Sequence, residues 1–219
     1  LQHTRTRYPG LVNPNLVTPW WLSGGISEAD CIAAYQPKGA ASYAASKVNL
    51  ANPGTYDLID TGHIPAWSSL NGWLFNGSTY LNTGIIPASD WTMIVGFDFA
   101  QPMSQTQSWM CGVDSAGNAR FYLAPTWNQT KRLYGSGGYS VKNGIYSSGI
   151  MAIAGQQPYF NGATDGAALT AWDTTQSRPI FIGCLNQISG SPIYYYKGNI
   201  QAISIYSVAL TAPQVAALT

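Results

Sequence analysis

Short stretches of alternating apolar and polar residues dominate the chain, and the clearest runs from Trp91 to Phe99. Its odd-numbered residues are all large and apolar, so they share one face of an extended strand with one buried side. Further stretches of strand-like composition lie at 31–35, 107–114, 119–125, 130–134, 150–154, 157–160, 179–184, 193–197 and 199–207. No long apolar stripe of helical period accompanies them. Many short strands between glycine-rich turns predict an all-β sandwich or barrel.

Two segments favour helix instead. Residues 39–46 are rich in alanine and predict a short helix. Near the C-terminus, Thr211 and Gln214 have the spacing of a capping box, with a proline in the first turn. This pattern predicts a short C-terminal helix whose Val215 and Leu218 face the sandwich.

The first 25 residues differ from the rest of the chain. Three prolines recur there at intervals of five residues, and proline disfavours helix at the residue before it. We therefore predict an extended arm over residues 1–25 and a sandwich domain over residues 26–219. The arm residues expected to make assembly contacts are Arg5, Arg7, Trp20 and Trp21. Such an arm either crosses its own domain or reaches a neighbouring copy, and the pattern leaves both open.

Charged residues make up only 9% of the 219-residue chain, against roughly 25% in an ordinary soluble domain. The formal net charge is +1. Weak self-repulsion lets copies pack closely, so we expect self-association. The lack of a basic stripe argues against a nucleic-acid partner. No run of about 18 apolar residues predicts insertion into a membrane.

The three cysteines, Cys31, Cys111 and Cys184, cannot all pair within one chain, and no C-x-x-C spacing indicates zinc. Buried thiols on strands are one interpretation, and a single disulfide with one free thiol is the other. The chain begins at Leu1, which predicts a processed or trimmed N-terminus. We expect an extracellular protein, or one displayed on a virion or cell surface.

Several segments, taken in order, resemble one family. They are residues 73–81 (WLFNGSTYL), 91–99, 159–162 (YFNG), 180–185 (IFIGCL) and 196–211. Together they resemble the laminin-G-like branch of the concanavalin A-like lectin/glucanase superfamily. The resemblance implies a concanavalin A-like jelly-roll β-sandwich of two antiparallel sheets. It does not imply one function, because the superfamily includes lectins, glycosidases, adhesion domains and virion components.

Catalysis by the mechanism of that superfamily is not expected. Its glucanases resemble one another in an E-x-D-x-E strand motif, whose carboxyl groups act as nucleophile and acid/base. Glu28 is the one glutamate of this sequence, so the motif is absent. His63 lies in a proline-bearing loop, and no G-x-S-x-G element accompanies it. We therefore expect no enzyme activity, and a glycoside-active enzyme is the least favoured alternative.

Calcium is the one cofactor that the resemblance implies. Relatives in the superfamily often hold Ca²⁺ in rim loops, which makes Asp114 and Asn118 candidate ligands. The same stretch, Asp-Ser-Ala-Gly-Asn, is also an ordinary hairpin turn, and we favour the turn.

Glycan binding needs exposed aromatic rings that stack on sugars and planar polar groups that meet hydroxyls. The candidate residues of these types are Trp127, Asn128, Tyr134, Trp172, Asn186 and Tyr195. Among these, we expect Trp127 to be the most exposed. In the tyrosine run 194–196, strand alternation places Tyr195 on the face opposite its two neighbours.

Two classes of function fit these observations. The favoured one is a non-catalytic structural or adhesion subunit of an extracellular or virion assembly, with glycan binding as a second property. The alternative is a dedicated, lectin-like carbohydrate-binding domain. Low charge and the proline-rich arm favour assembly, whereas the loop aromatics favour carbohydrate as the partner.

Overall fold

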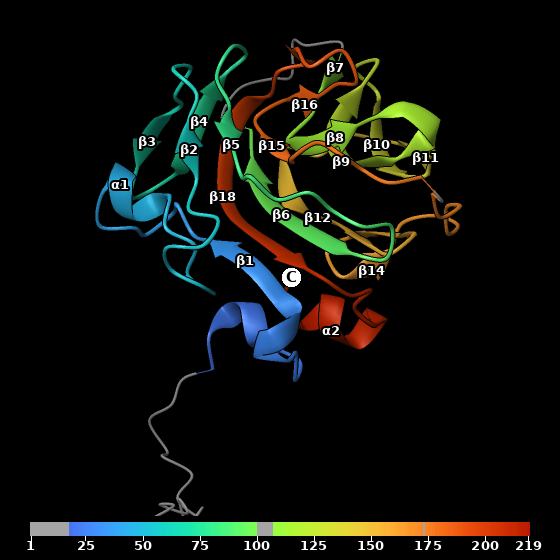
Figure 1. The fold of residues 1–219 in the computed structure, drawn as a ribbon, viewed down its shortest axis with the longest axis horizontal. Coiled ribbons are helices and arrows are strands. Elements are labelled where there is room, and N and C mark those ends of the chain that lie inside the picture. The colour runs from blue at the N-terminus through green and yellow to red at the C-terminus, as the bar shows by residue number, and fades with distance from the viewer. Residues whose placement is uncertain (1–17, 100–106, 173) are drawn as a thin grey trace, which may run out of the picture.

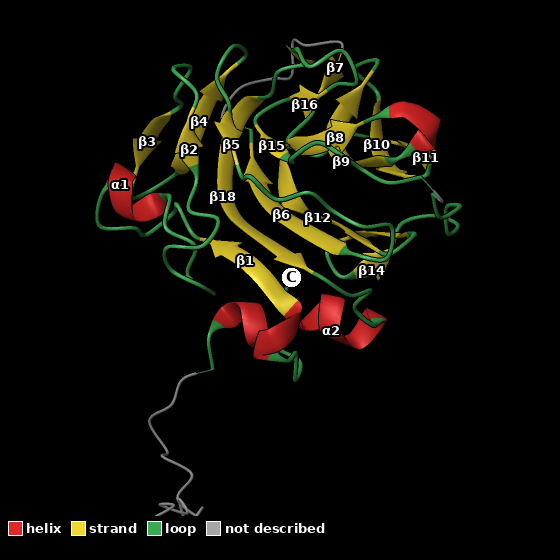
Figure 2. Cartoon of the chain, in the orientation of Figure 1, coloured by secondary structure: helices red, strands yellow, loops and turns green. Residues whose placement is uncertain are grey.

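Two antiparallel β-sheets stack face to face in the computed structural model, which describes residues 18–99, 107–172 and 174–219 (Figure 1). Helix is confined to short segments outside the sheets (Figure 2). The all-β sandwich of two antiparallel sheets predicted from the sequence is thus confirmed. In the described ranges, no helix is long and apolar enough to cross a membrane.

Sheet A has eight strands in the described part of the chain, and β18 is the longest of them. Its path is β14 (Ala163–Thr164), β13 (Gln157–Phe160), β12 (Ser148–Ala154), β6 (Thr92–Asp98), β18 (Lys197–Tyr206), β4 (Gly72–Asn76) and β3 (Ala66–Ser68). The remaining strand, β1 (Cys31–Tyr35), pairs with the second half of β18, whose first half pairs with β4.

Sheet B has ten strands among the described residues. Its path is β11 (Gly138–Asn143), β10 (Lys131–Ser136), β9 (Arg120–Trp127), β8 (Cys111–Asp114), β15 (Phe181–Ile182), β5 (Leu81–Asn82) and β2 (Ile59–Asp60). Three short strands flank this path: β7 (Gln107–Ser108), β16 (Leu185–Asn186) and β17 (Pro192–Ile193). β16 meets β8 in a single parallel pair, and the other strand pairs are antiparallel.

The helical segments are η1 (Trp20–Leu22), η2 (Glu28–Asp30), α1 (Tyr43–Ser46), η3 (Ala116–Asn118) and α2 (Ala212–Ala217). α1 is shorter than the predicted 39–46 helix, because Ser42 caps it and its Oγ accepts from the Ala45 amide at 3.0 Å. α2 forms as predicted: the Thr211 amide donates to Gln214 Oε1 at 2.9 Å. Val215 is buried, so the helix faces the sandwich as its pattern predicts.

Most predicted strands are present, but the predicted strand 193–197 is not, because β17 ends at Ile193, β18 begins at Lys197 and Tyr194 between them has a φ of +53°. β1 and β13 match their predicted bounds. The predicted strand 179–184 shortens to β15, because Gly183 has a φ of +93° that extended backbone does not adopt. β11 was not predicted: it is an edge strand of mixed polarity whose side chains alternate between exposed and half-buried.

The main core lies between the sheets. Met93, Val95 and Phe97 of β6 belong to it, with Phe99 just beyond the strand, which confirms the face predicted from their alternation. Trp73 of β4 is fully buried in the same core, and its Nε1 donates to Ser46 Oγ at 2.8 Å. A large indole thus becomes buried without an unpaired donor.

All three cysteines are buried free thiols, as one of the two interpretations predicts, with Cys31 and Cys111 on strands and Cys184 between β15 and β16. Burial raises the pKa of Cys31 to about 12, with partial offset by a hydrogen bond to the Ala33 carbonyl. The thiolate is therefore disfavoured, and these residues act as small apolar side chains.

A second apolar cluster covers the outer face of sheet A. η1 and α2 lie over this face, below β1 and β18 in Figure 1, and Trp20 and Trp21 pack against the cluster. Tyr206 Oη donates to the Trp21 carbonyl at 2.8 Å. The aromatic end of the predicted arm therefore contacts its own domain, whereas Arg5 and Arg7 lie outside the described residues.

Candidate functional site

A third apolar cluster lies on the outer face of sheet B, the face turned away from sheet A. On β9, Phe121 and Leu123 belong to the main core, so strand alternation turns Tyr122 and Ala124 outward. Trp109, two residues before the start of β8, belongs to the same cluster. Strands β8, β9 and β10 lie at the upper right of Figure 1. Residues of these strands line a hollow on the outer face of sheet B.

This hollow, which we call the aromatic groove, has a volume of about 460 Å³. Its aromatic lining consists of Trp109, Tyr122, Trp127, Tyr139 and Tyr194. Its polar lining consists of Asp114, Arg120, Lys131 and Gln187. Volume and lining are those of a ligand site, in which apolar walls carry a few placed polar groups.

Trp109 is the centre of the aromatic lining. The Tyr194 ring stacks on its indole with centroids 4.4 Å apart, and the rings of Tyr122 and Trp127 meet it edge-on at 5.8 and 5.6 Å. The Trp109 amide donates to the Tyr194 carbonyl at 2.9 Å, which ties the two chain segments together. Trp109 is only 2% exposed, whereas Tyr194 is 39% exposed, so Tyr194 presents an open ring face above a buried one.

Tyr122 lies between two glycines on the neighbouring strands. Gly112 of β8 and Gly135 of β10 are its partners across the sheet, and Tyr139 of β11 is the next residue in the same row. A Cβ placed on Gly135 would overlap the Tyr122 ring. The absence of a side chain there lets the ring lie along the sheet, which keeps this part of the face hollow.

The polar groups at one end of the groove form a cross-strand pair. Arg120 Nε lies 3.4 Å from Asp114 Oδ1, and these side chains are 29% and 23% exposed. The terminal nitrogens of Arg120 have no hydrogen-bond partner in the described ranges. Burial raises the pKa of the Asp114 carboxyl above 3.8, and the Arg120 charge offsets part of that rise. The pair therefore retains both donors and acceptors for a ligand.

The opposite end of the groove is marked by Trp127 and Lys131. These residues face each other between β9 and β10. Lys131 has no ion-pair partner within the described residues. Trp127 lines the groove but is only half-buried, so it is less exposed than Tyr139 and Tyr194 of the same lining, whereas Asn128 lies in the adjoining turn and is exposed.

Two other residues predicted to bind glycan lie away from the groove. Tyr134 is fully buried in the main core, and its hydroxyl donates to Asp165 at 2.6 Å. Asn186 is 3% exposed, and its Nδ2 donates to the Pro179 carbonyl at 2.8 Å. Both side chains are engaged inside the protein, so neither can reach a ligand in this structure.

The tyrosine run does not have the strand alternation that the sequence predicts, because Tyr196 is buried in the main core whereas Tyr194 lines the groove. Tyr195 is half-buried and its ring lies 6.2 Å from that of Tyr80. Tyr194, with a φ of +53°, stands over Trp109 instead. Trp172, another candidate, is 7% exposed and meets Phe121 edge-on.

The donor set at Asp114 and Asn118 does not fit a calcium ion. Asp114 is paired with the Arg120 cation, which opposes a second positive charge there. Asn118 has a φ of +63° in the turn that joins β8 to β9, as the hairpin interpretation expects. No group of three or more His, Cys, Asp or Glu side chains suited to a metal occurs in the part of the chain that is described.

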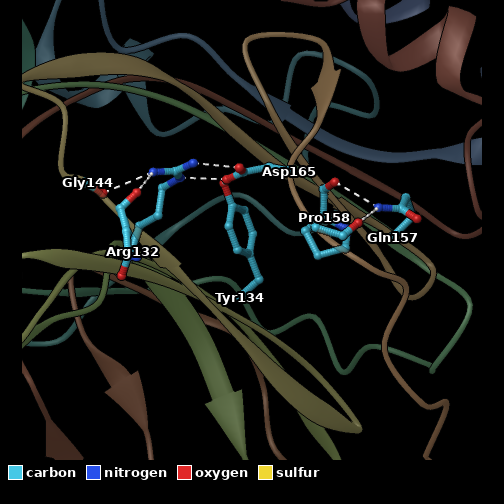
Figure 3. Close-up of polar contacts among 8 residues, drawn as sticks. Arg132, Tyr134, Gly144, Gln157, Pro158 and Asp165 are labelled. Atoms are coloured by element: carbon cyan, nitrogen blue, oxygen red, sulfur yellow. Dashed lines mark hydrogen bonds and ion pairs between the residues drawn. The ribbon is translucent and has the colours of Figure 1, made fainter.

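A buried polar cluster lies on the other side of sheet B, between it and the β13–β14 hairpin (Figure 3). Arg132 donates to both carboxylate oxygens of Asp165 at 2.5 Å and to the carbonyls of Asn143 and Gly144 at 2.8 and 3.0 Å. With Tyr134 also bound to Asp165, the cluster is satisfied internally. We assign it a structural role.

No model of a known protein family matches the chain, and no curated protein sequence matches it. Solved structures do match. Domain 4 of AbnA, a GH43 extracellular arabinanase from Geobacillus stearothermophilus, in complex with arabinotriose, has a TM-score of 0.54 at 19% identity. The match covers 88% of this chain and 99% of that one.

Trypanosoma rangeli sialidase in complex with sialic acid has a TM-score of 0.58 at 14% identity, over 87% of this chain. The match covers 32% of the sialidase, so this chain spans about a third of that enzyme. Identities this low show the fold alone, and they do not distinguish the laminin-G-like branch. The chain therefore has a β-sandwich fold of the concanavalin-like, jelly-roll type.

Proposed function

We propose that this chain is a non-catalytic carbohydrate-binding module of an extracellular, virion or cell-surface assembly, and that the glycan lies in the aromatic groove. The observation that carries the proposal is the open Tyr194 ring stacked on the buried Trp109 indole, beside the Asp114–Arg120 pair. Aromatic rings contact the apolar faces of sugars, and the pair offers donors and acceptors to hydroxyls.

The structural neighbours support this choice of ligand class without deciding it. The matched arabinanase domain was solved with arabinotriose, and the sialidase with sialic acid. These ligands belong to those proteins, and what is shared with them is the fold. The groove of this chain supplies the separate, residue-level argument.

The carboxylate content of the groove favours binding over hydrolysis. Asp114 is the one carboxylate among the groove-lining residues that the structure describes. Hydrolysis of a glycosidic bond by the usual mechanisms requires two carboxyl groups that flank the bond. Glu28, the one glutamate of the chain, lies in η2 and does not line the groove.

The test compares two neighbouring tyrosines. Tyr194→Ala removes the open ring, and we expect its affinity for the glycan to fall on the order of tenfold or more, as does that of Trp127→Ala. Tyr195→Ala is the matched control, since its ring packs away from the groove, and we expect wild-type affinity. Glycan-array screening followed by calorimetry measures both.

Two results would contradict the proposal. Wild-type protein that binds nothing on a broad array would remove the ligand class. Equal losses in the Tyr194 and Tyr195 variants would show that the groove is not the binding site.

Self-association as a structural subunit is a second candidate function. The chain has little charge, and large apolar side chains are exposed near β2 and β3, with Leu70 at 74% and Ile59 at 57%. Such residues on a weakly charged surface favour contact between copies.

A further inference from the structure

A second hollow adjoins the aromatic groove. This end pocket has a volume of about 490 Å³ and includes Asn118, Gly138, Thr170 and Trp172 in its lining. Two residues, Arg120 and Tyr139, line both the end pocket and the aromatic groove. The two hollows are therefore neighbours that share a common border.

Resting on the proposed function, we infer that the aromatic groove and the end pocket are two subsites for one linear oligosaccharide. The ligand class is a chain of several sugar units that crosses the border at Arg120 and Tyr139. A single sugar ring is about the size of one aromatic side chain, so it would cover only one of the aromatic rings in the lining.

The length of the groove supports this assignment. Arg120 and Trp127 are the first and last residues of β9, and both line the groove. Seven residue steps at about 3.3 Å each give a strand length of roughly 23 Å. The end pocket extends the path beyond Arg120, over the turns that close β8–β9 and β10–β11.

The chemistry of the end pocket suits hydroxyl groups. Asn118 and Thr170 are exposed, and neither side chain has a hydrogen-bond partner among the residues described. The buried Trp172 contributes an apolar surface to the same lining. Tyr139, which is 60% exposed at the border, has a ring available to a sugar on either side. These groups repeat the combination found in the aromatic groove.

Gly138 allows the end pocket to be blocked selectively. It has no positive φ, and a Cβ placed on it meets no atom within 4 Å. Gly138→Trp therefore fills the pocket with a side chain while the backbone keeps its path. Gly138→Ala is the matched control, because it makes the same backbone change and leaves the pocket open.

The experiment measures affinity against ligand length. Calorimetry uses arabino-, xylo- and cello-oligosaccharides from one to six units, with the wild type, Gly138→Trp, Gly138→Ala and Tyr194→Ala. We expect wild-type affinity to rise with length. Gly138→Trp is expected to match the wild type on the shortest ligand that binds and to lose on the order of tenfold on the longest. Gly138→Ala is expected to match the wild type throughout.

The outcomes separate this inference from the proposed function. If Tyr194→Ala weakens every ligand but Gly138→Trp weakens none, the groove binds glycan and the end pocket is no subsite. Wild-type affinity that does not change with length also overturns the inference. If no oligosaccharide or array glycan binds the wild type, the proposed function fails, and this inference fails with it. Circular dichroism melts confirm that each variant is folded.

Discussion

Trp127 shows how far residue type alone can locate the groove. A tryptophan beside a polar turn is recognisable in the sequence, and the structure places it in the lining. Residue type does not identify Trp109 and Tyr194 as neighbours, because they lie 85 positions apart in the sequence. In the structure they are joined by a backbone hydrogen bond and a ring stack. The outward turn of Tyr194 depends on a φ of +53°, which residue type does not reveal.

Asp114 gives the groove a pH dependence that can be tested. Its raised pKa, caused first by burial, places protonation above the ordinary value of 3.8. We expect glycan affinity to fall as the pH is lowered through this pKa, because a protonated carboxyl is a poorer acceptor and a poorer partner for Arg120. Calorimetry over a pH series measures the effect.

Protonation of Asp114 should affect the stability of the fold in the direction opposite to its effect on glycan affinity. A carboxyl whose pKa is raised by folding binds protons more readily in the folded state, so its contribution favours folding at low pH and is lost as the pH rises through the folded pKa. Asp114→Asn removes both responses. An Asp114→Asn variant with an unchanged pH profile of binding would exclude Asp114 from the site.

Element by element, the sequence predicts what periodicity can encode. β6 was identified by its alternation, and its inward residues lie in the core. β11 lacks such a signal because it is an edge strand, paired on one side with β10. The ion pair that anchors β10 to the β13–β14 hairpin is also invisible in the pattern, since Arg132 and Asp165 are separated by 33 residues.

Removing one member of that ion pair should destabilise the junction between the sheets. Arg132 and Asp165 have side-chain exposures of 8% and 13%, so Arg132→Met leaves a buried carboxylate without its partner. We expect a loss of about 3–5 kcal/mol in the free energy of unfolding. Urea denaturation followed by tryptophan fluorescence measures it.

The double variant Arg132→Met/Asp165→Leu provides the control. It removes both charges, so no unpaired carboxylate remains buried, and we expect it to recover part of the stability lost in the single variant. A single variant that loses less than about 1 kcal/mol would show that the pair contributes no more than a surface salt bridge.

Over the whole molecule, the sandwich was predictable and the groove was not. Short strands in family-like order suffice for the fold, because alternation fixes which side of each strand is buried. The groove combines residues from positions 109–141 with Leu185, Gln187 and Tyr194. They come together because β8, β9, β10 and β11 pair in sequence and because β8 and Trp109 pair with the 185–195 segment. The pairing with the 185–195 segment has no local signal.

Assembly through the N-terminal segment is a property that the groove does not require. A chain that lacks residues 1–17 keeps Trp20 and Trp21 on the second apolar cluster, so we expect it to fold and to bind glycan as the full chain does. Loss of the expected contacts of Arg5 and Arg7 should lower self-association, measured by sedimentation velocity. Arg5→Ala/Arg7→Ala in the full chain separates the effect of the two cations from the effect of chain length.

Identical sedimentation of the full and shortened chains would exclude the arm as an assembly element. If both were monomers, the subunit role would lose its support, and glycan binding by a single sandwich would be the function left to explain the low charge.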